Sequence, residues 1–308
     1  MNFAFFGTDE FSVKVLETLK GRGLVPSLIV TVPDKPKGRK MIMTPPLVKV
    51  WGEENGVKII QPASLKNFLA DPKSDLVPQS TTSDQLSKKD FEKLDFSLVA
   101  SYGKIIPQEI LDLPTHGTLN IHPSLLPKYR GPSPLETAIL NGDSETGVTI
   151  IKLDTEMDHG PVLAQEPFDL SSEQGVPLYN FEQLRDKTAE LGAELLVKFL
   201  PDYLSDLPAQ AGKIELQEQG HDQATYTKKF VKPDGFLDPS SSTLINYRKI
   251  LALNPWPGTY LEYPGPTGKI RVIIRQAHLE ENELVYDLVT PEGRKEMTWV
   301  AFLNGFKK

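Results

Sequence analysis

The N-terminal twenty residues switch between two hydrophobic periodicities across one glycine turn. Residues 2–6 form a short apolar run, Gly7 opens a turn, and the apolar residues of 11–19 then recur at helical spacing. Looser copies of this unit follow, with strands expected at 28–31, 57–60, 96–100 and 118–121 and a helix from about 47. Strands that alternate with helices predict an α/β domain with a mostly parallel sheet, whose ligands bind beyond the carboxyl ends of the strands.

A polar loop at 154–160 lies between two further apolar runs, at 148–153 and 162–166. This pattern predicts a hairpin that closes the sheet and makes the loop a candidate site. A long covering helix is expected over 180–199, because its leucines recur on one side. The segment 71–93 is polar and charged, and we expect helix fragments or a surface excursion there.

The last third of the chain has a different pattern. Residues 207–224 are polar and contain Gly and Gln, which is typical of a linker. After them we expect a helix at 242–253 and then a small barrel of short strands, at 259–263, 269–275 and 284–288. The predicted organisation is a catalytic domain at 1–206, a linker at 207–224 and a second domain at 225–308.

Composition excludes several kinds of chemistry. The 308 residues contain no Cys, which rules out disulfides, thiolate metal sites and a cysteine nucleophile. No stretch approaches the ~18 apolar residues that cross a bilayer, so we expect a cytoplasmic protein that makes no membrane contact. The net charge of −7 is uneven, because residues 225–308 have 12 Lys and Arg against 9 Asp and Glu, a net +3, which leaves −10 for the rest. An acidic catalytic body with a mildly basic accessory domain fits this asymmetry.

Asn120 and His122 stand two residues apart at the end of the strand expected at 118–121. Their side chains therefore leave the same face. An amide donor and an imidazole aimed at one carbonyl oxygen would stabilise a developing oxyanion by roughly 2.7–4 kcal/mol for each well-placed donor. The same pair also fits a purely structural role, as an asparagine that caps a turn beside a hydrogen-bonded histidine.

Asp158 belongs to the expected hairpin loop, together with Asp154 and Glu156. Like charges and burial would raise the pKa of a carboxyl drawn into a cleft, and a placed base contributes typically ~10²–10⁴-fold to proton transfer. A solvated acidic loop explains the same residues without any chemistry.

Taken together, NIHPSLLPKYRG at 120–131 and DTEMDHG at 154–160 resemble the formyltransferases that use 10-formyltetrahydrofolate. Within that group the whole chain is similar to the methionyl-tRNA formyltransferase family, on FFGTDEF at 5–11, TVPDKPKGRK at 31–40, ASYGKIIP at 100–107 and ALNPWPGTY at 252–260. The resemblance implies a Rossmann-like formyltransferase domain with a mostly parallel sheet, and a C-terminal OB-like barrel. This barrel is expected to be shortened, because between 278 and 289 the chain lacks a strand pair that the family's barrel normally contains.

The resemblance also implies roles for individual residues. Asn120, His122 and Asp158 become the catalytic trio, which transfers a formyl group from 10-formyltetrahydrofolate to initiator methionyl-tRNA without a metal. The implied folate-binding residues lie in three segments near the trio: Ser101, Tyr102, Gly103, Ile105, Ser124, Leu125, Leu126, Pro127 and Asp154. The implied tRNA-binding residues are basic, with Arg39 as the key contact of a loop at 34–40: Lys35, Lys37, Arg39, Lys40, Lys228, Lys229, Arg271 and Arg275. We expect a monomer with folate and tRNA as its partners.

Two residues beside Asp158 depart from the family, which usually has Gly where Glu156 stands and a small or hydroxyl residue where His159 stands.

Two alternative functions stay open. A sugar-nucleotide N-formyltransferase would keep the trio but need no basic RNA surface, and a noncatalytic tRNA-binding protein would keep the fold without turnover. A dehydrogenase is disfavoured, because FFGTDE has one Gly where the dinucleotide fingerprint needs three.

Overall fold

The computed structural model of the chain describes residues 1–38, 40–65, 88–205, 216–265 and 268–305. Contacts divide the chain into two compact units, each assembled from separate segments. Unit 1 contains Met1–Arg130, Gly147–Glu166 and Asp186–Thr225, and unit 2 contains Gly131–Thr146, Pro167–Arg185 and Tyr226–Lys308. This grouping is by contact, whereas the boundaries expected at 206 and 225 follow the chain, and they stay a prediction.

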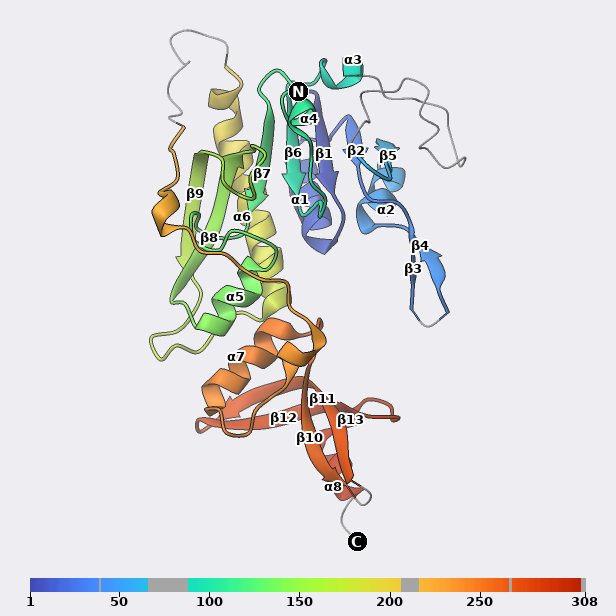
Figure 1. The fold of residues 1–308 in the computed structure, drawn as a ribbon, viewed down its shortest axis with the longest axis vertical. Helices are drawn as coiled ribbons and strands as arrows, with labels where there is room; N and C mark the ends of the chain where they lie inside the picture. Colours follow the sequence, from blue (N-terminus) through green and yellow to red (C-terminus); the bar gives the residue numbers. More distant parts are fainter. Residues whose placement is uncertain (39, 66–87, 206–215, 266–267, 306–308) are drawn as a thin grey trace. The chain divides into compact units, whose positions relative to one another are not determined.

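A seven-stranded sheet runs through unit 1 in the order β5-β2-β1-β6-β7-β8-β9 (Figure 1). Its strands are β1 (Phe3–Gly7), β2 (Leu28–Val30), β5 (Lys58–Ile60), β6 (Phe96–Ala100), β7 (Thr118–His122), β8 (Glu145–Lys152) and β9 (Val162–Asp169). The first five are mutually parallel, and β8 pairs with β7 in the antiparallel sense. The predicted α/β class is confirmed, and the predicted hairpin is β8 and β9 at the sheet edge.

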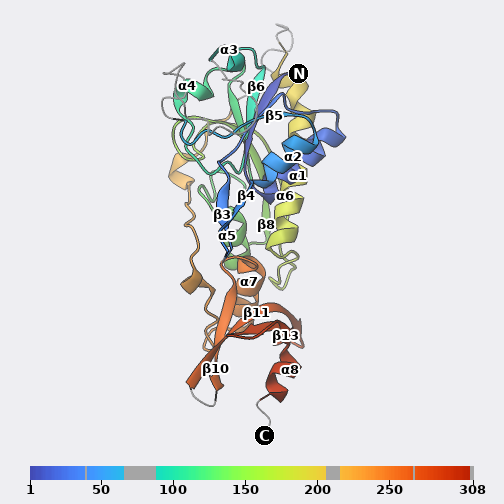
Figure 2. The same ribbon diagram turned by 90° about the vertical axis from the view of Figure 1, so that its right-hand side faces the viewer.

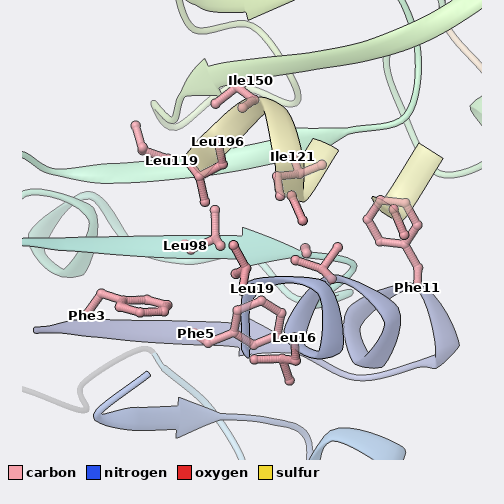
Figure 3. Packing of buried hydrophobic residues seen from close by; sticks show 14 of the residues in the cluster. Phe3, Phe5, Phe11, Leu16, Leu19, Leu98, Leu119, Ile121, Ile150 and Leu196 are labelled. Atoms are coloured by element: carbon pink, nitrogen blue, oxygen red, sulfur yellow. The ribbon is translucent and has the colours of Figure 1, made fainter. Parts of the chain in front are cut away.

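One face of the sheet is covered by α1 (Glu10–Gly21), α2 (Leu47–Glu54) and α6 (Phe181–Tyr203) (Figure 2). Asp9 caps α1, because its carboxylate accepts the amide of Ser12 at 3.3 Å while the Ser12 hydroxyl accepts the amide of Asp9. Large apolar side chains from the strands meet α1 and α6 in one core, which Figure 3 shows around Leu98, Leu119 and Leu196. The strand faces that alternate with this core carry the functional residues described below.

The basic segment near residue 35 is a two-stranded hairpin, of β3 (Lys35–Lys37) and β4 (Ile42–Thr44). The prediction of a loop is therefore wrong for residues 35–37. Pro36 and Gly38 are loop signals by composition, yet Gly38 has the positive φ of 70° that a turn between two strands requires. Short exposed strands of this kind carry no buried periodicity that would reveal them from sequence.

The remaining short helices of unit 1 are α3 (Lys88–Phe91), α4 (Gln108–Leu111) and the 3₁₀ turn η1 (His221–Gln223). Of the polar segment expected at 71–93, residues 71–87 lie outside the described residues. In the parts of the chain that the structure describes, no helix combines the length and the apolar character needed to span a bilayer.

Unit 2 contains a separate four-stranded antiparallel sheet in the order β10-β11-β12-β13. The strands are β10 (Thr259–Gly265), β11 (Gly268–Glu280), β12 (Glu283–Pro291) and β13 (Met297–Thr298), and the helical elements are α5 (Pro134–Asn141), η2 (Lys232–Gly235), α7 (Thr243–Leu253) and α8 (Trp299–Asn304). The expected helix at 242–253 is α7, and Ser242 caps it. β11 and β12 are longer than predicted, since Glu281 and Asn282 both take positive φ and join them in a tight turn.

Candidate active site

Asn120 and His122 lie on the same face of β7, opposite to Leu119 and Ile121, which enter the core. β7 is central, with β6 on one side and β8 on the other, so these two polar side chains are held by a fully paired strand. Only 8% of Asn120 and 4% of His122 is exposed. The alternation of the strand thus produces a buried polar pair at the carboxyl end of β7.

The His122 imidazole has a defined partner on each nitrogen. Its Nε2 lies 2.9 Å from the carbonyl oxygen of Tyr129, and its Nδ1 lies 3.5 Å from Oδ1 of Asp158. A carbonyl oxygen can only accept, so Nε2 carries a proton and donates it. Nδ1 is the nitrogen that faces the Asp158 carboxylate.

Asp158 reaches His122 from the loop between β8 and β9. Its backbone has a φ of 51°, in the left-handed region that non-glycine residues rarely occupy. Two residues on, Gly160 packs so tightly that a Cβ there would lie 1.9 Å from the carbonyl oxygen of Lys152. The loop therefore packs closely on β8 at Gly160.

The other acidic residues of the loop have different contacts. Asp154 accepts the amide of Glu156 at 2.9 Å with one oxygen and pairs with Nδ1 of His159 at 2.7 Å with the other. His159 in turn stacks on His221, with ring centroids 4.1 Å apart. His159 stands where the similar family usually has a small or hydroxyl residue, and here it pairs with Asp154. Asp158 is the loop carboxylate that faces His122.

The carboxamide of Asn120 makes no side-chain hydrogen bond to any part of the chain that the structure describes. Buried polar groups are normally satisfied, so a nearly buried amide without a protein partner suits a ligand oxygen.

The segment after β6 divides its residues between core and surface. Tyr102 packs on Phe6 in the core, and burial raises the pKa of its hydroxyl to about 12. Ser101 and Gly103 both have positive φ and are exposed, and Ile105 is 83% exposed. The hydroxyl of Ser101 donates to a carboxylate oxygen of Asp9 at 2.5 Å. Gly103 and Ile105 are thus the accessible members of this expected folate segment, whereas the Tyr102 side chain packs in the core.

The segment after β7 is tied to the β8–β9 hairpin. Thr149 donates to the carbonyl oxygen of Ser124 at 2.6 Å and accepts the amide of Leu126 at 3.0 Å. Leu126 packs on Ile151 and Val162, while Leu125 and Pro127 remain half-buried. These four expected folate residues form a fixed wall whose position follows from β8.

The basic residues expected to bind tRNA lie in both units. In unit 1, Lys35 and Lys37 are exposed on β3 and Lys40 follows the turn, whereas Arg39 lies outside the described residues. The hairpin also exposes apolar side chains of β4 and its turn: Met41, Ile42 and Met43.

In unit 2 the basic candidates differ in how they are held. Arg271 stacks over the ring of Tyr260 at 3.5 Å. Arg275 donates to the Thr290 hydroxyl at 3.2 Å and lies 3.9 Å from a Glu296 carboxylate oxygen. Lys228 pairs with Asp234 at 3.2 Å, and Lys229 is exposed.

Sequence patterns did not indicate three further residues near the trio. Arg130, Gln219 and His221 form a hydrogen-bonded chain that reaches the Asp158 loop. Arg130 stands in the quoted motif without a role, and the other two lie in the segment predicted to be a linker. No periodicity could have singled them out, because a polar residue in a polar segment resembles any exposed one.

The sequence pattern of the formyl transferase family matches residues 1–200. The chain therefore belongs to the formyl transferase family, in agreement with the resemblance found in the motifs. More specifically, it is 36% identical to the methionyl-tRNA formyltransferase of Chloroflexus aggregans, over 99% of this chain and 97% of that protein.

Two solved structures show the same fold at low sequence identity. The methionyl-tRNA formyltransferase from Clostridium thermocellum has a TM-score of 0.57 and 17% identity, over 94% of this chain and 98% of that one. A sugar N-formyltransferase from Shewanella sp FDAARGOS_354 has a TM-score of 0.58 and 18% identity, over 91% of this chain and 99% of that one. These structures support the fold and do not separate the two substrates.

Proposed function

We propose that this protein transfers the formyl group of 10-formyltetrahydrofolate to the amino group of initiator methionyl-tRNA. The observation that carries the proposal is the 36% identity with a methionyl-tRNA formyltransferase along 99% of the chain, because that similarity includes the C-terminal unit as well as the family domain. Exposed Lys and Arg residues in both units suit a polyanionic substrate.

The trio divides the chemistry between donor and proton-transfer groups. Asn120 donates from its unpartnered amide to the formyl oxygen, and stabilises the negative charge that develops there. 10-Formyltetrahydrofolate supplies the one-carbon group. Because an attacking α-amino group has a pKa near ~7.7–8.0, it must lose a proton to become a nucleophile. When the neutral amine then attacks the formyl carbon, its nitrogen releases a second proton. His122 and Asp158, at 3.5 Å, form the pair that accepts this second proton and returns one to the folate nitrogen as the bond between that nitrogen and the formyl carbon breaks.

A direct assay tests the proposed substrate. Purified protein is given 10-formyltetrahydrofolate together with either methionyl-tRNA or a nucleotide-linked amino sugar. We expect formylation of methionyl-tRNA alone. Formylation of the sugar alone would establish a sugar-nucleotide N-formyltransferase. Binding of tRNA without turnover of either substrate would establish a noncatalytic tRNA-binding protein.

Two further properties follow from the proposed substrates. We propose that the protein works as a monomer of 34.3 kDa in the cytoplasm, where charged tRNA is used. Sedimentation equilibrium tests the mass, and a dimer mass would contradict it. Cell fractionation tests the location, and recovery with the membrane fraction would contradict it.

A further inference from the structure

Gln219 lies far along the chain from the trio, yet its side-chain amide contacts the main chain that carries Asp158. The residue is 5% exposed. Its Nε2 donates to the carbonyl oxygen of Asp158 at 2.9 Å and to that of Gly160 at 2.7 Å. Both N–H donors of the amide are thus used on the two carbonyls that bracket the end of the loop.

The oxygen of the same amide is held by Arg130. Oε1 accepts from Nε of Arg130 at 3.1 Å and from Nη2 at 2.7 Å. The orientation of the amide is therefore determined, because exchanging its N and O would set donors against a guanidinium and an oxygen against two carbonyls. Arg130 follows Tyr129, whose carbonyl oxygen accepts the proton of His122. One buried amide thus links the main chain that orients His122 to the main chain that presents Asp158.

The segment that carries Gln219 is itself anchored on both sides. Gln217 forms a two-bond antiparallel bridge with Val162, at 2.8 and 3.0 Å. The carbonyl oxygen of Thr225 accepts the amide of Arg130 at 2.8 Å, and its hydroxyl accepts the amide of Tyr129 at the same distance. Between these anchors, Nδ1 of His221 accepts from Arg130 at 2.8 Å. The amide of Gln219 is therefore fixed in place on this segment.

We propose that Gln219 is a positioning residue, which holds the Asp158 carboxylate at its working distance from Nδ1 of His122. The left-handed backbone of Asp158 is unfavourable for a non-glycine residue and persists only where the surroundings determine it. Gln219 stabilises this backbone conformation through its hydrogen bonds to the carbonyls of residues 158 and 160. Without these bonds the carboxylate retreats from the imidazole, while the basic residues expected to bind tRNA keep their contacts.

The test uses Gln219→Glu in the full-length chain. A carboxylate of the same size still accepts from Arg130, but it cannot donate to the two carbonyls. Gln217→Glu is the matched control, because that side chain is exposed on the same segment. We expect Gln219→Glu to lower kcat ~10–100-fold, as a small misplacement of catalytic groups does. The KM for tRNA should stay within about threefold, because the basic residues expected to bind tRNA lie outside the Asp158 loop.

A second readout does not depend on turnover, and is needed because the kinetic part of this inference rests on the proposed formyl transfer. Amide hydrogen exchange at residues 156–160 should become ~10-fold faster in Gln219→Glu and unchanged in Gln217→Glu. Should the wild-type protein formylate no substrate, the proposed function fails, and the exchange data alone decide the role of Gln219.

Two results would overturn the inference: a kcat in Gln219→Glu that equals that of the control, or unchanged exchange in the Asp158 loop. Should this variant fail to fold, Gln219→Met, which keeps the length and removes every hydrogen bond, replaces it with the same expectations. The unaltered protein provides a third measurement, since slow exchange of the Gln219 side-chain amide protons supports the bonds and fast exchange contradicts them.

Discussion

The carboxyl end of β7 and the exposed surface of the C-terminal sheet hold their polar side chains in opposite ways. At β7, His122 is buried between a main-chain carbonyl and a carboxylate, and the loop that brings the carboxylate is tied down by Gln219. On the C-terminal sheet, Arg271 is exposed and stacks on Tyr260. Group transfer depends on geometry fixed to fractions of an ångström, whereas attraction of a phosphate backbone depends mainly on charge. The two regions therefore differ in how far a single substitution can disturb them.

The largest effect is expected at His122. His122→Ala should lower kcat ~10²–10⁴-fold, because it removes the group that we propose carries the proton. Steady-state kinetics with saturating tRNA measure the loss. The control is His278→Ala, which removes an exposed histidine of β11 that pairs with Asp287. Equal rates for the two variants would remove His122 from the mechanism. The carboxyl end of β7 would then be no more sensitive to substitution than the C-terminal sheet.

The next effect is expected at Asn120. Asn120→Asp keeps the shape but replaces the amide donor with a carboxylate, and should cost roughly 2.7–4 kcal/mol of transition-state stabilisation, or ~10²–10³-fold in kcat. The variant Asn304→Asp, at the exposed end of α8, controls for the added charge. A wild-type kcat in Asn120→Asp would mean that the amide serves the fold alone.

A smaller effect is expected from the packing beneath the Asp158 loop. Gly160→Ala places a Cβ 1.9 Å from the Lys152 carbonyl oxygen, and should lower the free energy of unfolding by about 1–3 kcal/mol. Urea denaturation measures it. Gly21→Ala, at the end of α1 with nothing within 4 Å, should instead raise stability by ~0.5–1 kcal/mol. Similar changes in the free energy of unfolding for the two variants would show that the loop accommodates the added Cβ and is not fixed by its contact with β8.

The smallest effect is expected on the C-terminal sheet. Arg271→Ala should weaken tRNA binding and reduce the slope of log affinity against log salt by about 1, the value for one phosphate contact. Arg275→Ala should change that slope less, because Arg275 already lies near Glu296. Filter binding over a salt series separates them. A larger change in slope for Arg275→Ala would mean that Arg275, and not Arg271, makes the phosphate contact. An unchanged slope in both variants would leave this sheet without a role in binding.

Much of the fold could be predicted because it depends on local pattern. The period-two alternation of β7 sent Leu119 and Ile121 to the core and Asn120 and His122 to the other face. Two apolar runs on either side of a polar loop predicted the hairpin of β8 and β9. Leucines at helical spacing predicted the long helix α6. It failed at β3, where an exposed strand has no buried face, and at β11 and β12, where the turn depends on two residues with positive φ.

The candidate site could be predicted only in part. Its histidine, asparagine and acidic loop were visible in the motifs, but three acidic residues of one loop could not be told apart. Asp154 is paired with His159, and Asp158 faces His122. That distinction depends on the left-handed backbone at Asp158 and on the hydrogen bonds from Gln219 to the carbonyls of Asp158 and Gly160.

Residue order alone decided which side chains share a face of a strand or helix, because that depends on a period of two or of 3.6 residues. Folding in three dimensions decided which nitrogen of His122 carries a proton, which carboxylate meets the other, and that Gln219 joins the site from 61 residues beyond Asp158. Contacts across such separations follow from how whole elements pack, and no local period records them.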